Sequence, residues 1–240
     1  MRAEVIKASS GAFSQRDVTD LGDGIVTVTM DGSYDLTART SQMQESWQTK
    51  SPTFLKTTPN PATLTTNFRD IGPNGYQSKP AWPAALRGRW LQTTSAKTVG
   101  QAASLSGGPK AASPETLAAL LALTPTSVKP GATGWTLSGR VRAPYAALAL
   151  GLGKELRKKS VNVTTMKGSA KITVEVAANG LPSQVRIDGS TLTVTSPLPA
   201  GFSAIFPRVQ ATLDLLEFGQ RVKISAPTGH ELISPSEMPS

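Results

Sequence analysis

His230 is the one histidine in this 240-residue sequence, and no cysteine accompanies it. A catalytic triad or a histidine metal site needs several partners that the fold brings together. Without cysteine, disulfides, thiolate metal sites and cysteine nucleophiles are excluded. His230 also lies in a C-terminal segment with proline and glycine, where partners are few. We therefore expect no catalytic residue, no metal and no cofactor.

The acidic residues could in principle supply the carboxylate pair of a glycosidase. They include Asp17, Asp20, Asp23, Glu45, Asp70, Glu175, Asp188 and Glu217. Most fall on the polar side of an alternating strand pattern or in a turn, which predicts solvated side chains without a site. Glu45, Glu175 and Asp188 are accordingly expected to be individually dispensable.

Two short motif matches are also weak. The stretch Gly107-Gly108-Pro109-Lys110 lacks the spacing and the preceding strand of a phosphate loop, so it reads as a linker. The triplet Asn162-Val163-Thr164 fits a glycosylation acceptor by pattern alone. Together with the histidine and the carboxylates, these observations predict that the protein is not an enzyme.

The segment Tyr145–Leu152 is apolar around its whole circumference if it is helical, and a helix of that kind must be covered on more than one side. It is either an ordinary buried helix or a helix with one face on a sheet and another facing a ligand cavity. Aromatic residues of the predicted strands would form the opposite wall. The candidate lining residues are Trp47, Phe54, Phe68, Trp90, Tyr145, Leu148 and Leu152.

The formal net charge of +9 suggests an anionic partner, whereas a solvated basic surface is the alternative. The basic residues are dispersed and are not interleaved with aromatic residues, which argues against nucleic acid. Only one cluster stands out, and it is the predicted contact with an anionic membrane. It consists of Lys154, Arg157, Lys158 and Lys159.

Alternation of apolar and polar residues predicts strands in the C-terminal half of the chain. Three of them should follow one another as an antiparallel meander, with the turn residues Asn179-Gly180 after the first. The predicted strands are Lys171–Val176, Gln184–Asp188 and Thr191–Thr195. A further strand is predicted over Trp135–Val141.

The N-terminal half shows the same pattern and predicts four strands, with Asp31-Gly32 as a hairpin turn. These are Ala12–Thr19, Gly24–Met30, Tyr34–Ala38 and Gln42–Thr49. Prolines between Ser51 and Ala85 predict edge strands or connectors, including extended pieces at Thr53–Leu55 and Thr63–Phe68. The sheet should resume at Arg87–Gln92.

Two helices are predicted between the strand sets, one from Ser113-Pro114-Glu115 and one from Pro144. The result is an α+β fold of one domain over residues 1–240, with a large curved antiparallel sheet. Residues 1–11 are expected to be the remainder of an N-terminal helix, and residues 228–240 a flexible tail. No run of apolar residues approaches the length of a membrane span.

The order of these elements resembles the LolA-like fold, and within it the actinobacterial LppX/LprG type of envelope lipoprotein. The residues that carry this resemblance are the turn Asn179-Gly180-Leu181-Pro182 and the ending Leu215-Leu216-Glu217-Phe218-Gly219, followed by Val222–Pro227. Proteins of this type look like a half-open barrel with helices on its concave side and an apolar cavity that accepts acyl chains.

The resemblance implies a non-enzymatic envelope protein that binds a lipid, a lipoglycan or a lipid-modified ligand for transport or presentation. It also implies an extracytoplasmic location at the outer face of the plasma membrane. The family's export signal and acylated cysteine are not found in this sequence, so expected anchoring rests on the resemblance alone. The alternative is a protein-interaction or sensor domain of the same fold with a filled core. We expect a monomer.

Overall fold

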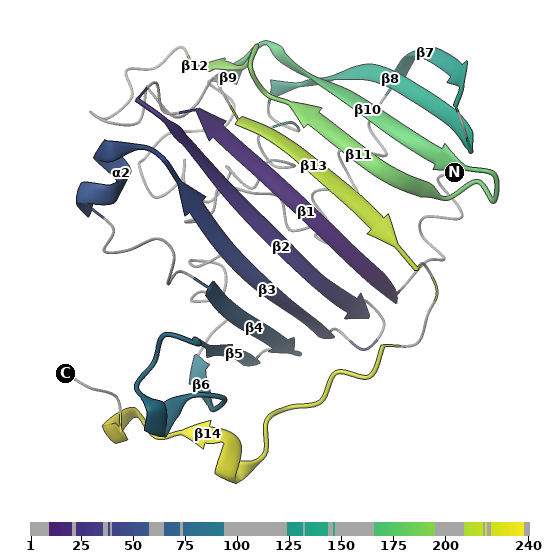
Figure 1. The fold of residues 1–240 in the computed structure, drawn as a ribbon. Helices are drawn as coiled ribbons and strands as arrows, with labels where there is room; N and C mark the ends of the chain where they lie inside the picture. The colour runs from purple at the N-terminus through teal and green to yellow at the C-terminus, as the bar shows by residue number, and fades with distance from the viewer. Residues whose placement is uncertain are drawn as a thin grey trace.

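The computed structural model describes residues 10–20, 23–35, 38, 40–57, 65–72, 74–93, 124–131, 133–143, 146, 166–194, 209–217, 219 and 222–237. These residues form a twelve-stranded sheet and a separate two-stranded one, and Figure 1 shows the large sheet twisting and curving across the molecule. The order in the large sheet is β14-β6-β5-β4-β3-β2-β1-β13-β11-β10-β8-β7. This is the large curved sheet that the sequence predicts.

The strands of the N-terminal half form a continuous antiparallel meander. They are β1 (Ser10–Asp20), β2 (Ile25–Asp35), β3 (Thr40–Thr49), β4 (Thr65–Ile71), β5 (Asn74–Ser78) and β6 (Trp90–Thr93). The strands of the C-terminal half are β7 (Thr124–Pro130), β8 (Gly134–Arg142), β10 (Ser169–Ala177), β11 (Pro182–Asp188) and β13 (Val209–Leu216). The two halves join where β1 pairs with β13.

The prediction of a hairpin turn at Asp31-Gly32 is wrong. Gly32 lies within the single strand β2, where it pairs with Phe13 on one side and Met43 on the other. The missing side chain leaves room for neighbours, because an added Cβ would lie 2.8 Å from Phe13 Cζ. Glycine here serves close packing between strands, and the predicted four strands are therefore three.

The hairpin at Asn179-Gly180 is confirmed. Gly180 has a φ of +80° and donates its N–H to the carbonyl of Ala177, while the side chain of Asn179 accepts the N–H of Leu181. The predicted place of the third strand, next to the second in the meander, is wrong, however. Thr193–Val194 forms β12, which pairs with β9 (Met166–Lys167) in the two-stranded sheet, and β13 takes the place beside β11. Periodicity marks a strand but does not choose its neighbour.

The sequence analysis missed β7, whose residues include Pro125 and Pro130. Proline lacks the N–H that a central strand donates to its ladder, and β7 lies at one edge of the sheet, where this is tolerated. The prediction of an extended piece at Thr53–Leu55 is also wrong, because these residues belong to the short helix α2 (Pro52–Thr57).

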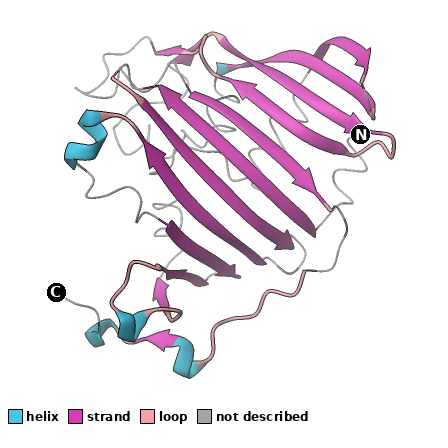
Figure 2. Ribbon diagram, viewed as in Figure 1, coloured by secondary structure: helices cyan, strands magenta, loops and turns pink. Residues whose placement is uncertain are grey.

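Figure 2 shows that the described residues are mostly strands joined by loops, with only short helical pieces. Besides α2, these are the 3₁₀ turns η2 (Ala84–Leu86), η5 (Gly229–Glu231) and η6 (Pro235–Glu237). Both predicted long helices fall mainly outside the described residues, as does the N-terminal segment up to residue 9. Ser10 and Gly11, expected to end a helix, instead begin β1.

Residues 228–237 make specific contacts with the rest of the protein, whereas the sequence predicted a flexible tail here. The strand β14 (Leu232–Ile233) pairs in parallel with β6, and Ile233 packs in a small core with Trp82 and Leu86. Arg89 Nη1 lies 2.8 Å from Glu237 Oε1. Figure 1 shows the C-terminal segment, defined as residues 222–237, running from near the end of β13 past the strand ends to β6.

The two faces of the large sheet differ in chemistry because side chains alternate along each strand. The apolar face carries the main core, which runs from β2 through β1, β13, β11 and β10 to β8. Its buried side chains include Phe13, Val26, Val28, Met30, Tyr34, Val141, Ile172, Val174, Val185, Ile187, Leu213 and Leu215. The opposite, polar face is lined mainly by Ser, Thr, Asn, Gln and charged residues.

Candidate functional site

Cross-strand neighbours on the apolar face form a continuous row over eight strands. From β7 to β3 the row is Val128, Leu137, Val174, Val185, Leu213, Gln15, Met30 and Glu45. Residues that pair across antiparallel strands point to the same side of a sheet. The row is therefore apolar over its first five strands, and polar side chains enter it at β1 and β3.

Gln15 and Asp17 are the central polar residues of this face, and each is only 1% exposed. Gln15 Nε2 donates to both carboxylate oxygens of Asp17, at 2.9 Å each. Gln15 Oε1 is buried and has no hydrogen-bond partner among the described residues. A polar pair is thus enclosed within an otherwise apolar layer.

Burial raises the pKa of Asp17 from 3.8 to about 8, the hydrogen bond from Gln15 opposes this, and the nearby Glu45 carboxylate adds to it. Removing a carboxylate from water disfavours its charged form. Asp17 therefore keeps its proton to a higher pH than an exposed aspartate does. Glu45 is 4% exposed, and its Oε1 accepts the indole N–H of Trp47 at 2.7 Å.

The expectation that Asp17 and Glu45 are solvated is wrong. A signal in the sequence could have placed them, because Asp17 has the same strand parity as Phe13, and Glu45 has that of Met43 and Trp47. Their neighbours on that face are apolar, so both carboxylates had to be buried with them. Asp188, in contrast, is only partly buried and pairs with Lys171 across the strands, in line with the sequence analysis.

The predicted ligand-lining residues separate in the structure. Trp47 and Phe68 lie on the apolar face, where Trp47 is half-buried against the main core and Phe68 is buried. Trp90 does not join them. Leu91 pairs with Gln77, which pairs with Phe68, so Leu91 faces the apolar side and Trp90 the polar side. The prediction of a shared aromatic wall is therefore wrong for Trp90.

Several predicted site residues lie outside the described residues. Phe54 belongs to α2, but its side chain is not described. The others are Tyr145, Leu148 and Leu152 of the apolar segment and the basic residues Lys154, Arg157, Lys158 and Lys159. Within the segment, Ala146 is helical and fully buried, and with Ala143 it belongs to the main core. Ala143 and Ala146 therefore pack against the apolar face.

The apolar face is incompletely covered at the β7–β8 edge. Val128 is 56% exposed and Trp135 is 52% exposed, while Leu137 between them is half-buried against the core. Trp135 pairs with Val176 and Leu137 with Val174, so these side chains continue the apolar face. The protein therefore presents an apolar rim, defined as Val128, Trp135 and Leu137.

The remaining chemistry among the described residues is limited. His230 lies in η5, exposed, with its Nδ1 3.4 Å from Thr228 Oγ1. In the described part of the chain, no group of three or more His, Cys, Asp or Glu side chains is placed to hold a metal ion. None of the described helices has the length and apolarity needed to cross a membrane.

The arrangement is similar to that in the crystal structure of the Mycobacterium tuberculosis lipoprotein LppX, with a TM-score of 0.46 and 14% sequence identity. The alignment covers 93% of this chain and 97% of that protein. No protein-family model and no curated protein matches the chain.

Proposed function

We propose that this protein binds a lipid or an acylated ligand against the apolar face of its sheet and carries or presents it in the cell envelope. The observation that carries the proposal is the apolar rim. Soluble proteins rarely leave contiguous large apolar side chains open to water unless something binds there. The rim is continuous with the main core through Leu137, so a chain-like apolar ligand could extend from one to the other.

Removing acyl chains from water would drive this binding. Each fully buried methylene contributes about 0.8 kcal/mol, so a chain of about ten buried methylenes is needed for the roughly 8 kcal/mol of a micromolar dissociation constant. The mechanism is sequestration, with no bond made or broken. The burial of Ala143 and Ala146 in the main core supports it, because both residues pack against the apolar face.

A second candidate is a protein-interaction or sensor domain with a filled core. The observation in its favour is the tight closure of the core centre, where Ile172, Val174 and Val185 are each at most 1% exposed. On this view the rim binds an apolar protein surface. The two candidates differ in whether free fatty acid enters the protein.

Titration with a fluorescent fatty acid tests the proposal. Wild-type protein should bind it, and a Val128→Ser, Trp135→Ser variant should bind at least about tenfold less tightly, since the variant removes apolar contact worth roughly 1.4 kcal/mol or more. Ser138→Ala on the polar face of β8 is the matched control and should bind like wild type. Absence of uptake by wild type, or equal uptake by the rim variant, would refute the proposal.

A further inference from the structure

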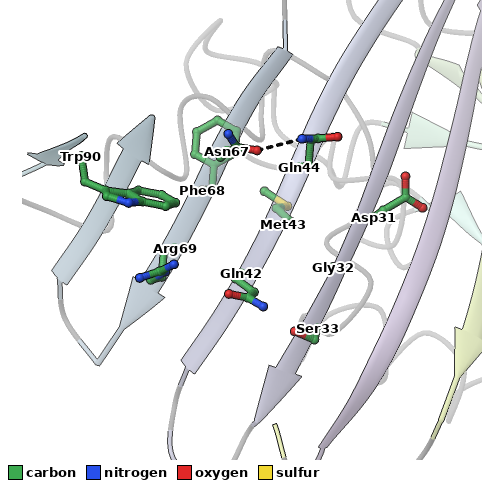
Figure 3. A pocket seen from close by; sticks show the side chains of 10 residues that line it. All are labelled: Asp31, Gly32, Ser33, Gln42, Met43, Gln44, Asn67, Phe68, Arg69 and Trp90. Atoms are coloured by element: carbon green, nitrogen blue, oxygen red, sulfur yellow. Dashed lines mark hydrogen bonds between the residues drawn. The ribbon is translucent and has the colours of Figure 1, made fainter. Parts of the chain in front are cut away.

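A groove of about 360 Å³ lies on the polar face, away from the apolar rim and the main core. Figure 3 shows the side chains that line it, which come from β2, β3, β4 and β6. They are Asp31, Gly32, Ser33, Gln42, Met43, Gln44, Asn67, Phe68, Arg69 and Trp90. Its volume falls within the range of small-ligand sites.

The strand register fixes which side chains face into the groove. Asp31, Gln44 and Asn67 are cross-strand neighbours in one row, and Ser33, Gln42 and Arg69 are neighbours in the next. Met43 and Phe68 alternate with them and point to the apolar face. The groove therefore has a floor of sheet backbone and a lining of polar groups in two parallel rows.

The lining offers both hydrogen-bond donors and hydrogen-bond acceptors, and it carries no excess charge. Gln44 Nε2 donates to Asn67 Oδ1 at 3.0 Å, as the dashed line in Figure 3 marks. Each amide has two donors and an acceptor oxygen, so this bond leaves the Gln44 carbonyl and the Asn67 N–H groups for a ligand. Gln42 and Ser33 add further neutral donors and acceptors.

An aromatic ring closes one side of the groove. The indole of Trp90 extends toward β4, where the Arg69 guanidinium lies 4.5 Å from the ring centroid. Arg69 Nη1 also donates to the Ser225 carbonyl of the C-terminal segment at 2.9 Å. Contacts with Trp90 and with Ser225 hold the guanidinium in place, so the ring and the cation form a fixed wall.

We propose that this groove binds a neutral oligosaccharide. Sugar hydroxyls donate and accept at once, which suits amides that offer both, and the apolar C–H face of a pyranose ring suits the face of an indole. The single cation Arg69 is balanced by Asp31, so the groove lacks the excess positive charge that phosphates or nucleic acid require. The site is separate from the apolar face and does not depend on the function proposed for that face.

The test is nuclear magnetic resonance titration of the full chain with neutral hexasaccharides of glucose, mannose and galactose. At least one should shift the amides of Gln44, Asn67 and Arg69. A Gln44→Ala, Asn67→Ala variant should bind about tenfold more weakly, as expected for the loss of one to two hydrogen bonds. Trp90→Phe, which keeps an aromatic ring, should weaken binding less than the double variant does.

Gln48→Ala is the matched control, because Gln48 lies on the polar face of β3, beside Thr27 and outside the groove. It should bind like wild type, and all variants should keep the wild-type melting temperature. No shift at the groove with any hexasaccharide at 10 mM or so, or stronger shifts with inorganic phosphate, would overturn the proposal. The rim variant Val128→Ser, Trp135→Ser should retain sugar binding, which separates a failure of this site from one of the apolar face.

Discussion

Among the described residues, Asp17 stands out as a carboxyl group in an apolar environment that disfavours its charged form. Its carboxyl is enclosed with Gln15 in an apolar layer, and burial raises its pKa to about 8. The neutral acid carries an O–H group, and turning the Gln15 amide over would give that group an acceptor in Oε1. An O–H···O bond from Asp17 to the amide exists only while Asp17 keeps its proton.

The unfolded chain releases this proton near pH 3.8 and the folded chain only near 8, so wild-type stability should fall as pH rises between these values. The slope for one independent group is about 1.4 kcal/mol per pH unit. Asp17→Asn has no proton to lose, and the variant should gain stability over wild type with rising pH, up to about pH 8. Urea unfolding at several pH values from 4 to 9 measures this.

Parallel pH profiles for wild type and Asp17→Asn would contradict this account of the buried acid. The isosteric Asp188→Asn is a suitable control, because Asp188 lies on the polar face and hydrogen bonds from Ser190 lower the pKa of its carboxyl. It should not flatten the profile in the same range.

At the residue scale, the sequence predicted well which residues lie in strands, but it predicted the burial of individual side chains only in part. Strand parity places Asp17 and Glu45 on the apolar face, but charge alone suggested solvent. Trp90 shows the reverse error, since an aromatic ring suggested the core while register places it on the polar face. Burial of a side chain follows from its face and its neighbours more than from its own polarity.

At the scale of elements, Gly32 allows β1, β2 and β3 to pack closely. An added Cβ would clash with the Gln42 carbonyl oxygen and lie 2.8 Å from Phe13 Cζ and 2.9 Å from Met43 Cβ. Gly32→Ala should therefore destabilise the fold by about 1–3 kcal/mol through overpacking. Chemical denaturation measures the loss, and Gly229→Ala, with open space around the added atom, should cost little. Equal stability of both variants would contradict the packing described for β2.

The C-terminal segment depends on contacts around Arg89. Its Nη1 and Nη2 bind the two carboxylate oxygens of Glu237 at 2.8 and 3.0 Å, and Nη2 also donates to the Leu232 carbonyl at 2.6 Å. Glu237→Gln should loosen β14 and speed hydrogen exchange at Ile233. The exposed Lys223→Ala in the same segment should not, and identical exchange in the two variants would show that the ion pair does not hold β14.

Strands with strict alternation were predicted well, and elements defined by partners were not. The strands β1, β3, β8, β10 and β11 follow from period-2 patterns near their observed limits. By contrast, β9 and β14 have two residues each, and only their pairing with β12 and β6 defines them. A short pairing of this kind leaves no periodicity in the sequence.

At the scale of the molecule, the net charge of +9 favours contact with acidic lipid surfaces. The basic cluster Lys154, Arg157, Lys158 and Lys159 should contribute most, at about 1 kcal/mol per residue near the surface. Vesicle co-sedimentation at low salt should show binding that high salt weakens and that alanine at all four positions reduces. Binding by the four-site variant equal to wild type, or none at either salt concentration, would remove the cluster from this role.

The sequence predicted the large curved sheet and its one apolar face, and the structure contains both. It could not show the apolar rim, because the exposure of Val128 and Trp135 depends on what the rest of the chain covers. It also could not show the groove, whose two rows come together only through the register of β2, β3 and β4.

Native mass spectrometry of the purified protein, before and after solvent extraction, tests the proposed acyl ligand most directly. The account predicts an added mass in the range of a lipid that extraction removes and that added fatty acid replaces. A protein that shows only the mass of its own chain, before extraction and after exposure to excess fatty acid, would contradict it.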